Sequence, residues 1–186
     1  MKQGFVKVAS ATPRIRVADP VYNAQVICEQ AKEAAEHGAK IVVFPELCIT
    51  GYTCNDLFLQ ELLLEKAKEA LLTIVEETGQ LEALFLAGLP VDKDGRLYNV
   101  AAVLYRGRIL GMIPKKNIPM YAEFYEGRHF TPGEETVTEY RLGKQEIPFG
   151  TNLLFRCEEL PELILGCELC EDLWVAEPPS TSHALM

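Results

Sequence analysis

The sequence lacks several features that mark common classes of protein. Its 186 residues contain no apolar run of transmembrane length, and after Met1 and Lys2 the chain enters a strand-like run, so no signal peptide is expected. Only 18 residues are basic against 27 acidic, for a net charge of −9. This balance argues against a nucleic-acid surface and against an anionic membrane. We therefore expect a cytoplasmic protein with neither a nucleic-acid nor a membrane partner.

Histidine is scarce, and glycine-rich phosphate loops are missing. None of the three histidines, His37, His129 and His183, follows a predicted strand, so a cysteine–histidine pair of the papain type is not expected. No Walker or Rossmann pattern is present, and segment 88–90 is predicted to be a structural turn. ATP and NAD precursors are therefore not expected to bind this chain.

What is present is typical of a globular domain. Hydrophobic residues make up 48% and charged residues 24% of the chain, which favours a single domain with one core. The six cysteines, without an export signal, are predicted to be reduced thiols.

Helix signals open the chain. Asp19 and Pro20 predict an N-cap followed by the first helical residue, and Gly38 predicts the end of that helix. A second helix is expected to be capped at Asn55 and Asp56.

Strand signals alternate with these helices and then dominate. The predicted strands cover residues 5–9, 41–44, 83–89, 98–105, 108–113, 136–140, 152–156 and 162–167. Two of them form a hairpin across residues 106–107, whereas residues 116–133 are predicted to be a loop that faces substrate. We expect an α/β fold, with one layer of helices on a mixed sheet.

Three predicted strands end near side chains that are capable of chemistry. A carboxylate, Glu46, follows the first of them, an ammonium, Lys115, follows the second, and a thiol, Cys170, follows the third. Glu46 could take the thiol proton and pass it to a leaving amine, while Lys115 offsets charge on the attacked carbonyl oxygen. This combination indicates acyl transfer from an amide.

The same segments carry a family resemblance. Residues 44–52 (FPELCITGY), 114–121 (PKKNIPMY) and 170–174 (CEDLW) resemble, in order, the glutamate, lysine and cysteine motifs of the nitrilase, or carbon–nitrogen hydrolase, superfamily. Residues 50–58 (TGYTCNDLF) and 123–128 (EFYEGR) resemble one branch, the glutaminase domains of glutamine-dependent NAD synthetases. The resemblance implies a nitrilase-like α-β-β-α sandwich, formed when two α/β halves meet.

The resemblance also implies roles for particular residues. Cys170 would form a γ-glutamyl thioester and release ammonia from glutamine, Glu46 would act as general base and acid, and Lys115 would stabilise the oxyanion. The spacing to Pro119 selects Lys115 over Lys116. Residues matching the second acidic position and the glutamine pocket, which we group as substrate-binding candidates, are Tyr52, Tyr121, Glu126, Glu171 and Trp174. No metal is implied.

Members of this branch are longer than the present chain. The resemblance therefore implies that residues 1–186 form only the N-terminal part of the glutaminase domain, incomplete at the C-terminus. The ammonia-accepting synthetase domain, in which ATP and Mg²⁺ are expected, is absent from this sequence. Sheet edges left unpaired would favour self-association, so a homo-oligomer is expected.

Other functions stay open from the residues alone. The chain could be a different nitrilase-type amidase, such as an ω-amidase or carbamoylase, or an inactive half-domain that only associates with itself. Cys167 and Cys170 also have the Cys-x-x-Cys spacing of zinc and redox sites, but the sequence offers no second ligand pair.

Overall fold

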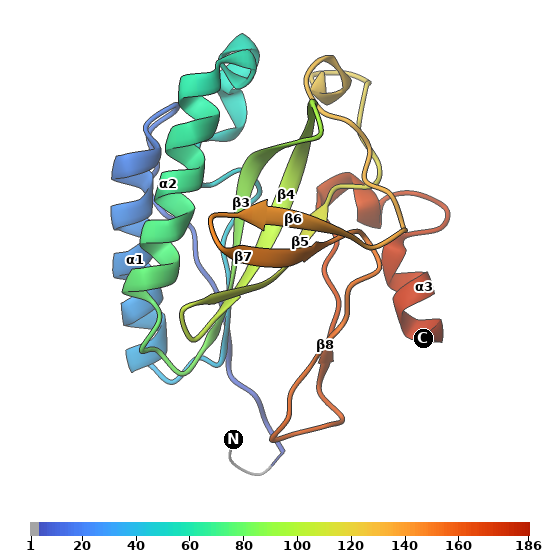
Figure 1. The fold of residues 1–186 in the computed structure, drawn as a ribbon. Helices are drawn as coiled ribbons and strands as arrows, with labels where there is room; N and C mark the ends of the chain where they lie inside the picture. Colours follow the sequence, from blue (N-terminus) through green and yellow to red (C-terminus); the bar gives the residue numbers. More distant parts are fainter. Residues whose placement is uncertain (1–3) are drawn as a thin grey trace.

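The computed structural model describes residues 4–186 as helices packed on one face of a sheet. Two long helices form one layer, a seven-stranded sheet packs beside them, and the C-terminal segments lie on the other side of the sheet (Figure 1). The predicted mixed α/β arrangement is confirmed. No helix of the described residues is long and apolar enough to cross a membrane.

The large sheet is mixed in direction. Its strand order is β1-β2-β3-β4-β5-β7-β6. The pairs β1–β2, β2–β3 and β5–β7 are parallel, whereas β3–β4, β4–β5 and β6–β7 are antiparallel. The strands are β1 (Val8–Ser10), β2 (Ile41–Val43), β3 (Leu84–Lys93), β4 (Arg96–Tyr105), β5 (Arg108–Pro114), β6 (Thr138–Leu142) and β7 (Gln145–Phe149). A separate two-stranded sheet pairs β8 (Phe155–Arg156) with β9 (Ile164–Leu165).

The first helix, α1 (Pro20–Glu36), follows the sequence signals closely. The Asp19 carboxylate accepts a hydrogen bond from the Tyr22 backbone N–H at 3.1 Å, as an N-cap should. The helix ends just before Gly38, whose φ of +82° only glycine adopts without cost.

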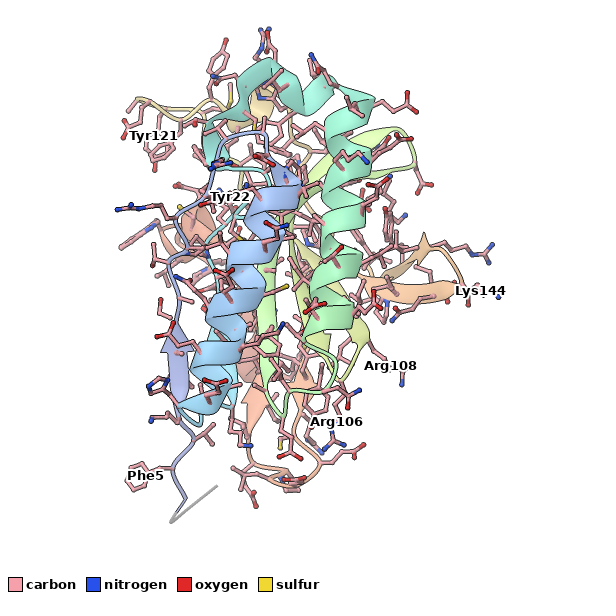
Figure 2. All side chains as sticks on the ribbon, turned by 90° about the vertical axis from the view of Figure 1, so that its left-hand side faces the viewer. Phe5, Tyr22, Arg106, Arg108, Tyr121 and Lys144 are labelled. Atoms are coloured by element: carbon pink, nitrogen blue, oxygen red, sulfur yellow. The ribbon has the colours of Figure 1, made fainter. Side chains whose placement is uncertain are left out.

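The second long helix, α2 (Glu61–Glu77), lies beside α1 on the same face of the sheet (Figure 2). The largest hydrophobic cluster fills the space between this layer and the sheet. Ile27, Leu71 and Ile74 are fully buried there, each contributing roughly 1.5–3 kcal/mol by leaving water. The helix layer thus fixes the sheet from which the site is built.

The opposite face of the sheet is covered only in part. A smaller cluster joins Leu86, Val103 and Ile113 of the sheet to Leu169. On the two strands at one edge, Val8 and Val43 remain 63% and 44% exposed. The segments that cover this face are β8, β9, the 3₁₀ helix η3 (Cys170–Leu173) and α3 (Pro179–Leu185).

The start of α2 differs from the prediction. Its N-cap residue is Gln60 rather than Asn55 or Asp56. Those two residues belong to the 3₁₀ helix η1 (Tyr52–Leu59), and the Asp56 carboxylate is engaged by Arg128 and His129. A tertiary contact therefore takes the side chain that was expected to cap the helix.

Two strand predictions were also wrong. Segment 88–90 is not a turn but the middle of β3, which extends to Lys93. Strand β7 was not predicted, and it contains Pro148, a residue that usually disfavours a strand. The structure tolerates this proline because β7 meets β5 only at Phe149, so most of that edge of β7 is unpaired.

Candidate active site

Glu46 lies in the turn that follows β2. This turn is held against β3, since Ile49 N–H donates to the Gly88 carbonyl at 3.1 Å. A Cβ added at Gly88 would lie 2.3 Å from the Leu47 backbone nitrogen and 2.9 Å from the Glu46 carbonyl carbon. Gly88 is therefore needed for a close backbone approach that sets the position of Glu46.

Lys115 directly follows β5 and is fully buried. Its backbone N–H donates to the Asn99 carbonyl of β4 at 2.8 Å, which fixes the start of the loop. Its ammonium donates to Glu46 Oε1 and to Glu126 Oε1, both at 2.7 Å. The neighbouring Lys116 instead pairs at the surface with Glu135, so only Lys115 reaches Glu46.

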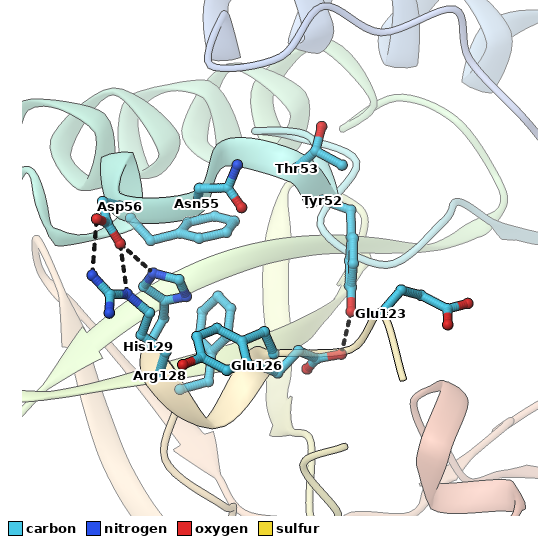
Figure 3. Close-up of a pocket in the computed structure, with 11 residues that line it drawn as sticks. Tyr52, Thr53, Asn55, Asp56, Glu123, Glu126, Arg128 and His129 are labelled. Carbon is cyan, nitrogen blue, oxygen red and sulfur yellow. Dashed lines mark hydrogen bonds and ion pairs between the residues drawn. The ribbon is translucent and has the colours of Figure 1, made fainter. Parts of the chain in front are cut away.

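Glu126 supplies the second carboxylate from the 3₁₀ helix η2 (Glu126–Arg128). It is 5% exposed and also accepts a hydrogen bond from the Tyr52 hydroxyl at 2.8 Å (Figure 3). The structure thus brings together Glu46, Lys115, Glu126 and Tyr52. All four were singled out from the sequence.

Asn99 on β4 was not singled out. Its side-chain amide donates to Glu46 Oε1 at 2.7 Å and to Glu126 Oε2 at 3.3 Å. The residue is buried, so these bonds form away from water, where they matter most. A neutral donor between two carboxylates reduces their mutual repulsion without adding a second cation.

This cluster holds one buried ammonium, the buried Glu126 carboxylate and the partly exposed Glu46 carboxylate. Burial raises the pKa of Glu46, and Glu126 raises it further, against the lowering effect of Lys115 and Asn99. Burial alone would lower the pKa of Lys115, but Glu46 and Glu126 outweigh it and hold that pKa above its ordinary value. At neutral pH the lysine is therefore a fixed cation, and Glu46 is more basic than a free glutamate.

Cys170 opens η3 and lies within electrostatic range of this cluster. Partial burial raises its thiol pKa, the charge of Glu46 raises it further, and Lys115 opposes them. The residue is exposed, and its φ is +45°, a left-handed conformation that side chains disfavour. At neutral pH the thiol is protonated, so reaction requires a base to remove its proton.

The remaining substrate-binding candidates lie at the surface. The Tyr121 hydroxyl donates to Glu171 Oε2 at 2.7 Å, next to Cys170. Trp174 is 74% exposed. Neither Tyr121 nor Trp174 lines the pocket that Tyr52 and Glu126 line.

That pocket has a volume of about 400 Å³ and opens beside the carboxylate cluster (Figure 3). At its far side the Asp56 carboxylate accepts two hydrogen bonds from Arg128, at 2.8 and 2.9 Å, and lies 3.1 Å from His129 Nε2. These contacts hold the pKa of Asp56 at about 2. They also join η1, which carries Tyr52, to η2, which carries Glu126.

Asp172, like Asn99, is a buried polar residue that was not singled out from the sequence. It is 1% exposed and lies two residues after Cys170. Its carboxylate accepts hydrogen bonds from the segment that follows Lys115 and from Leu169. No local pattern indicates this contact, because the partners are up to 56 residues apart.

Two other cysteines have thiols that are hard to ionise. Burial raises the pKa of Cys48 and of Cys167 to about 12. Within residues 4–186, no group of three or more His, Cys, Asp or Glu side chains is arranged to hold a metal ion.

Comparison with known proteins gives consistent matches. Residues 7–183 match the family described as carbon-nitrogen hydrolase. The glutamine-dependent NAD(+) synthetase of Mycobacterium tuberculosis (strain H37Rv) is 40% identical over 184 residues, which is 99% of this chain and 27% of that protein.

Solved structures agree with this match. A glutamine-dependent NAD(+) synthetase from Cytophaga hutchinsonii superposes with a TM-score of 0.82 at 28% identity, over 89% of this chain and 28% of that one. An amidase from Nesterenkonia sp. shares the fold, with a TM-score of 0.58 at 23% identity over 77% of this chain and 54% of that one. The nitrilase-like fold is thereby confirmed. The chain spans about a quarter of the length of the synthetases, as the 27% and 28% coverages state.

Proposed function

Because the chain belongs to the carbon-nitrogen hydrolase family, we propose that it is a cysteine amidohydrolase module that releases ammonia from glutamine. The observation that carries this proposal is the buried Lys115 ammonium between Glu46 and Glu126, with Cys170 in electrostatic range. This arrangement provides a nucleophile, a base with a raised pKa and a fixed cation, which amide hydrolysis requires.

The acylation step follows from these groups. Glu46 takes the proton of the Cys170 thiol, and the sulfur attacks the side-chain amide carbon of glutamine. Lys115 donates two N–H groups to carboxylates and keeps its third for the developing oxyanion. Glu46 then gives its proton to the amide nitrogen, the C–N bond breaks, and ammonia leaves a γ-glutamyl thioester on Cys170.

Deacylation repeats the sequence with water. Glu46 removes a proton from the attacking water, Lys115 again stabilises the oxyanion, and the C–S bond breaks. Glutamate is released, and Cys170 recovers its proton from Glu46. Glu46 thus acts as base and acid in turn, for which its raised pKa is suited.

The other candidates are proposed to bind substrate. Tyr52 and Glu126 form one side of the glutamine site, and the Tyr121–Glu171 pair forms another next to the nucleophile. A carboxylate such as Glu171 is a suitable acceptor for the α-ammonium group of an amino acid. Trp174 is exposed at the surface. It would contact substrate only if another part of the full protein or a second copy packed over it.

The relatives suggest where the ammonia goes. Since they are named as glutamine-dependent NAD(+) synthetases, we propose that residues 1–186 are the N-terminal part of a glutaminase domain that acts in the cytoplasm. A synthetase domain, using ATP and Mg²⁺, would accept the ammonia to amidate deamido-NAD. No cofactor is proposed for this chain itself. We further propose a homo-oligomer in which the partly covered sheet face and the sheet edges are buried.

A diazo-ketone analogue of glutamine, 6-diazo-5-oxo-L-norleucine, tests the function. We expect a single adduct on Cys170 by intact mass and peptide mapping, blocked by excess glutamine and lost in Glu46→Gln, together with ammonia release from glutamine. Adducts spread evenly over the six cysteines, or none, would contradict a glutaminase site and favour a non-catalytic half-domain. Hydrolysis of other small amides in place of glutamine would instead indicate a different amidase of the family.

A further inference from the structure

We propose that Asp172 is a positioning residue that holds the Cys170 turn against the segment that carries Lys115. The proposal rests on the amidohydrolase function above for its kinetic consequence, but not for its structural one. Asp172 would not touch substrate. It would act through the two residues that do, by fixing where the nucleophile stands relative to the cation.

The hydrogen bonds of Asp172 divide between two segments. Its Oδ1 accepts from the Asn117 backbone N–H at 2.7 Å and from the Asn117 side-chain amide at 2.9 Å. Its Oδ2 accepts from Leu169 N–H at 3.1 Å and from Lys116 N–H at 3.3 Å. One buried carboxylate thus joins the residue before the nucleophile to the two residues after the catalytic lysine.

The chemistry of these contacts requires a carboxylate. All four partners are N–H donors. An ionised carboxylate matches them because both of its oxygens accept hydrogen bonds and neither donates. An asparagine in the same place would turn an NH₂ group toward two of the donors. Hydrogen bonds to a buried charge are among the strongest in proteins, so this contact is suited to holding a strained turn.

The turn that it holds is strained. Cys170 has a φ of +45°, which side chains disfavour, and such strain persists only where surrounding contacts impose it. On one side of the contact, Lys115 is fixed to β4 through Asn99. A continuous chain of hydrogen bonds and backbone therefore runs from β4 through Lys115 and the residues after it to Asp172, and from there to the turn of Cys170. This chain would fix the position of the nucleophile relative to the cation.

The kinetic test compares Asp172→Asn with the parent protein at its natural length. Active sites are titrated with 6-diazo-5-oxo-L-norleucine, so that kcat is expressed per competent site. We expect kcat to fall about 10- to 100-fold while KM changes less than about threefold, because misplacement affects the transition state more than binding. A kcat per site within about twofold of the parent would overturn the proposal, even if the variant unfolds at a lower temperature.

A second variant covers the case in which Asp172→Asn does not fold. Asn117→Ala removes one of the four donors and leaves the carboxylate and its other bonds. We expect a fall in kcat of about two- to fivefold per titrated site. The matched control is Glu177→Gln, which removes an exposed carboxylate five residues further along the chain. It should leave kcat unchanged, and equal losses in the control and in Asn117→Ala would count against the proposal.

Amide hydrogen exchange tests the contact without glutamine. In the parent protein, the amides of Leu169, Lys116 and Asn117 should exchange slowly, and in Asp172→Asn they should exchange at least about tenfold faster. The Lys115 amide, bonded to Asn99, is the internal reference and should keep its protection. Equal exchange in both proteins would overturn the proposal. If the parent fails to hydrolyse glutamine, the proposed function fails, while this measurement still decides the role of Asp172.

Discussion

Two charged clusters each draw one side chain from the 3₁₀ helix η2, Glu126 in one and Arg128 in the other, and they differ in almost every other respect. In the buried cluster, the cation Lys115 lies between two carboxylates. In the exposed cluster, the carboxylate Asp56 lies between Arg128 and His129. The contacts are of similar length, 2.7 Å in the first and 2.8 to 3.1 Å in the second.

Burial, rather than geometry, separates what the two clusters can do. Lys115 is 0% exposed, whereas the Asp56 side chain is 64% exposed. Water and salt screen the exposed cluster, so it serves as a tether between η1 and η2. In the buried cluster the charges are screened far less, so Lys115 and Glu126 shift the pKa of Glu46 in opposite directions, and both carboxylates raise the pKa of Lys115.

The largest effect is expected from Lys115→Met. It leaves the buried Glu126 and the partly exposed Glu46 without their cation, which costs about 3–5 kcal/mol of stability, and removes the proposed oxyanion donor, so glutamine hydrolysis should fall by at least about 10³-fold. Ammonia release and denaturant unfolding measure the two losses. Lys116→Met is the matched control, since that side chain pairs with Glu135 at the surface. If both variants lost activity equally, the buried cluster would not be the catalytic one.

Gly88→Ala should have the next largest effect. The added Cβ would overlap the backbone of the Glu46 turn, 2.3 Å from Leu47 N, so we expect about 1–3 kcal/mol of destabilisation and a fall in kcat of about tenfold or more. Gly143→Ala provides the contrast, because its φ of +60° is strained but its Cβ meets no atom within 4 Å. Thermal unfolding and kcat should therefore separate the two, with only stability affected at Gly143.

Glu126→Gln sharpens the electrostatic part of the comparison. Activity requires ionised Glu46, so its raised pKa places the acid limb of the kcat/KM profile above pH 4.5, the ordinary value. Because the Glu126 charge raises that pKa, removing it should move the acid limb to lower pH. A profile measured from pH 4 to pH 9 tests this, and an unmoved acid limb would show that the two carboxylates are not coupled.

Asp56→Asn should have the smallest effect. The folded-state pKa of Asp56 is lowered from 3.8 to about 2, so its ion pairs stabilise the fold above pH 3.8, and this contribution is lost as the pH falls toward 2. Urea midpoints of parent and variant should differ slightly at pH 7 and converge as the pH falls through about 2. A gap that persists at low pH would mean that Asp56 acts through packing rather than charge.

Local signals in the sequence were sufficient for much of the fold and for part of the site. Asp19 and Pro20 predicted the start of α1, and the motif spacing distinguished Lys115 from Lys116, which the surface pairing of Lys116 supports. The failures share a cause. Asp56 was expected to cap a helix but is bound by side chains 72 and 73 residues away, and sequence order does not show which distant polar groups meet.

Asn99 illustrates the same limit inside the site. On the sequence it is one polar residue in an apolar strand, and only the fold reveals that it lies between carboxylates 53 and 27 residues away. The roles of Cys170, Tyr121 and Trp174 stay predictions, because they come from two separate motifs and their action depends on bound substrate.

The raised pKa of Cys170 has a consequence for survival in an oxidising environment. Peroxides react with thiolates far faster than with thiols. Partial burial and the neighbouring Glu46, Glu126 and Glu171 all favour the protonated form of Cys170, so we expect its conversion to sulfenic acid between turnovers to be slow. The carboxylate that we propose as the base for Cys170 would thus also shield it at rest, so the resting protein should tolerate oxidant levels that inactivate cysteine enzymes with a standing thiolate.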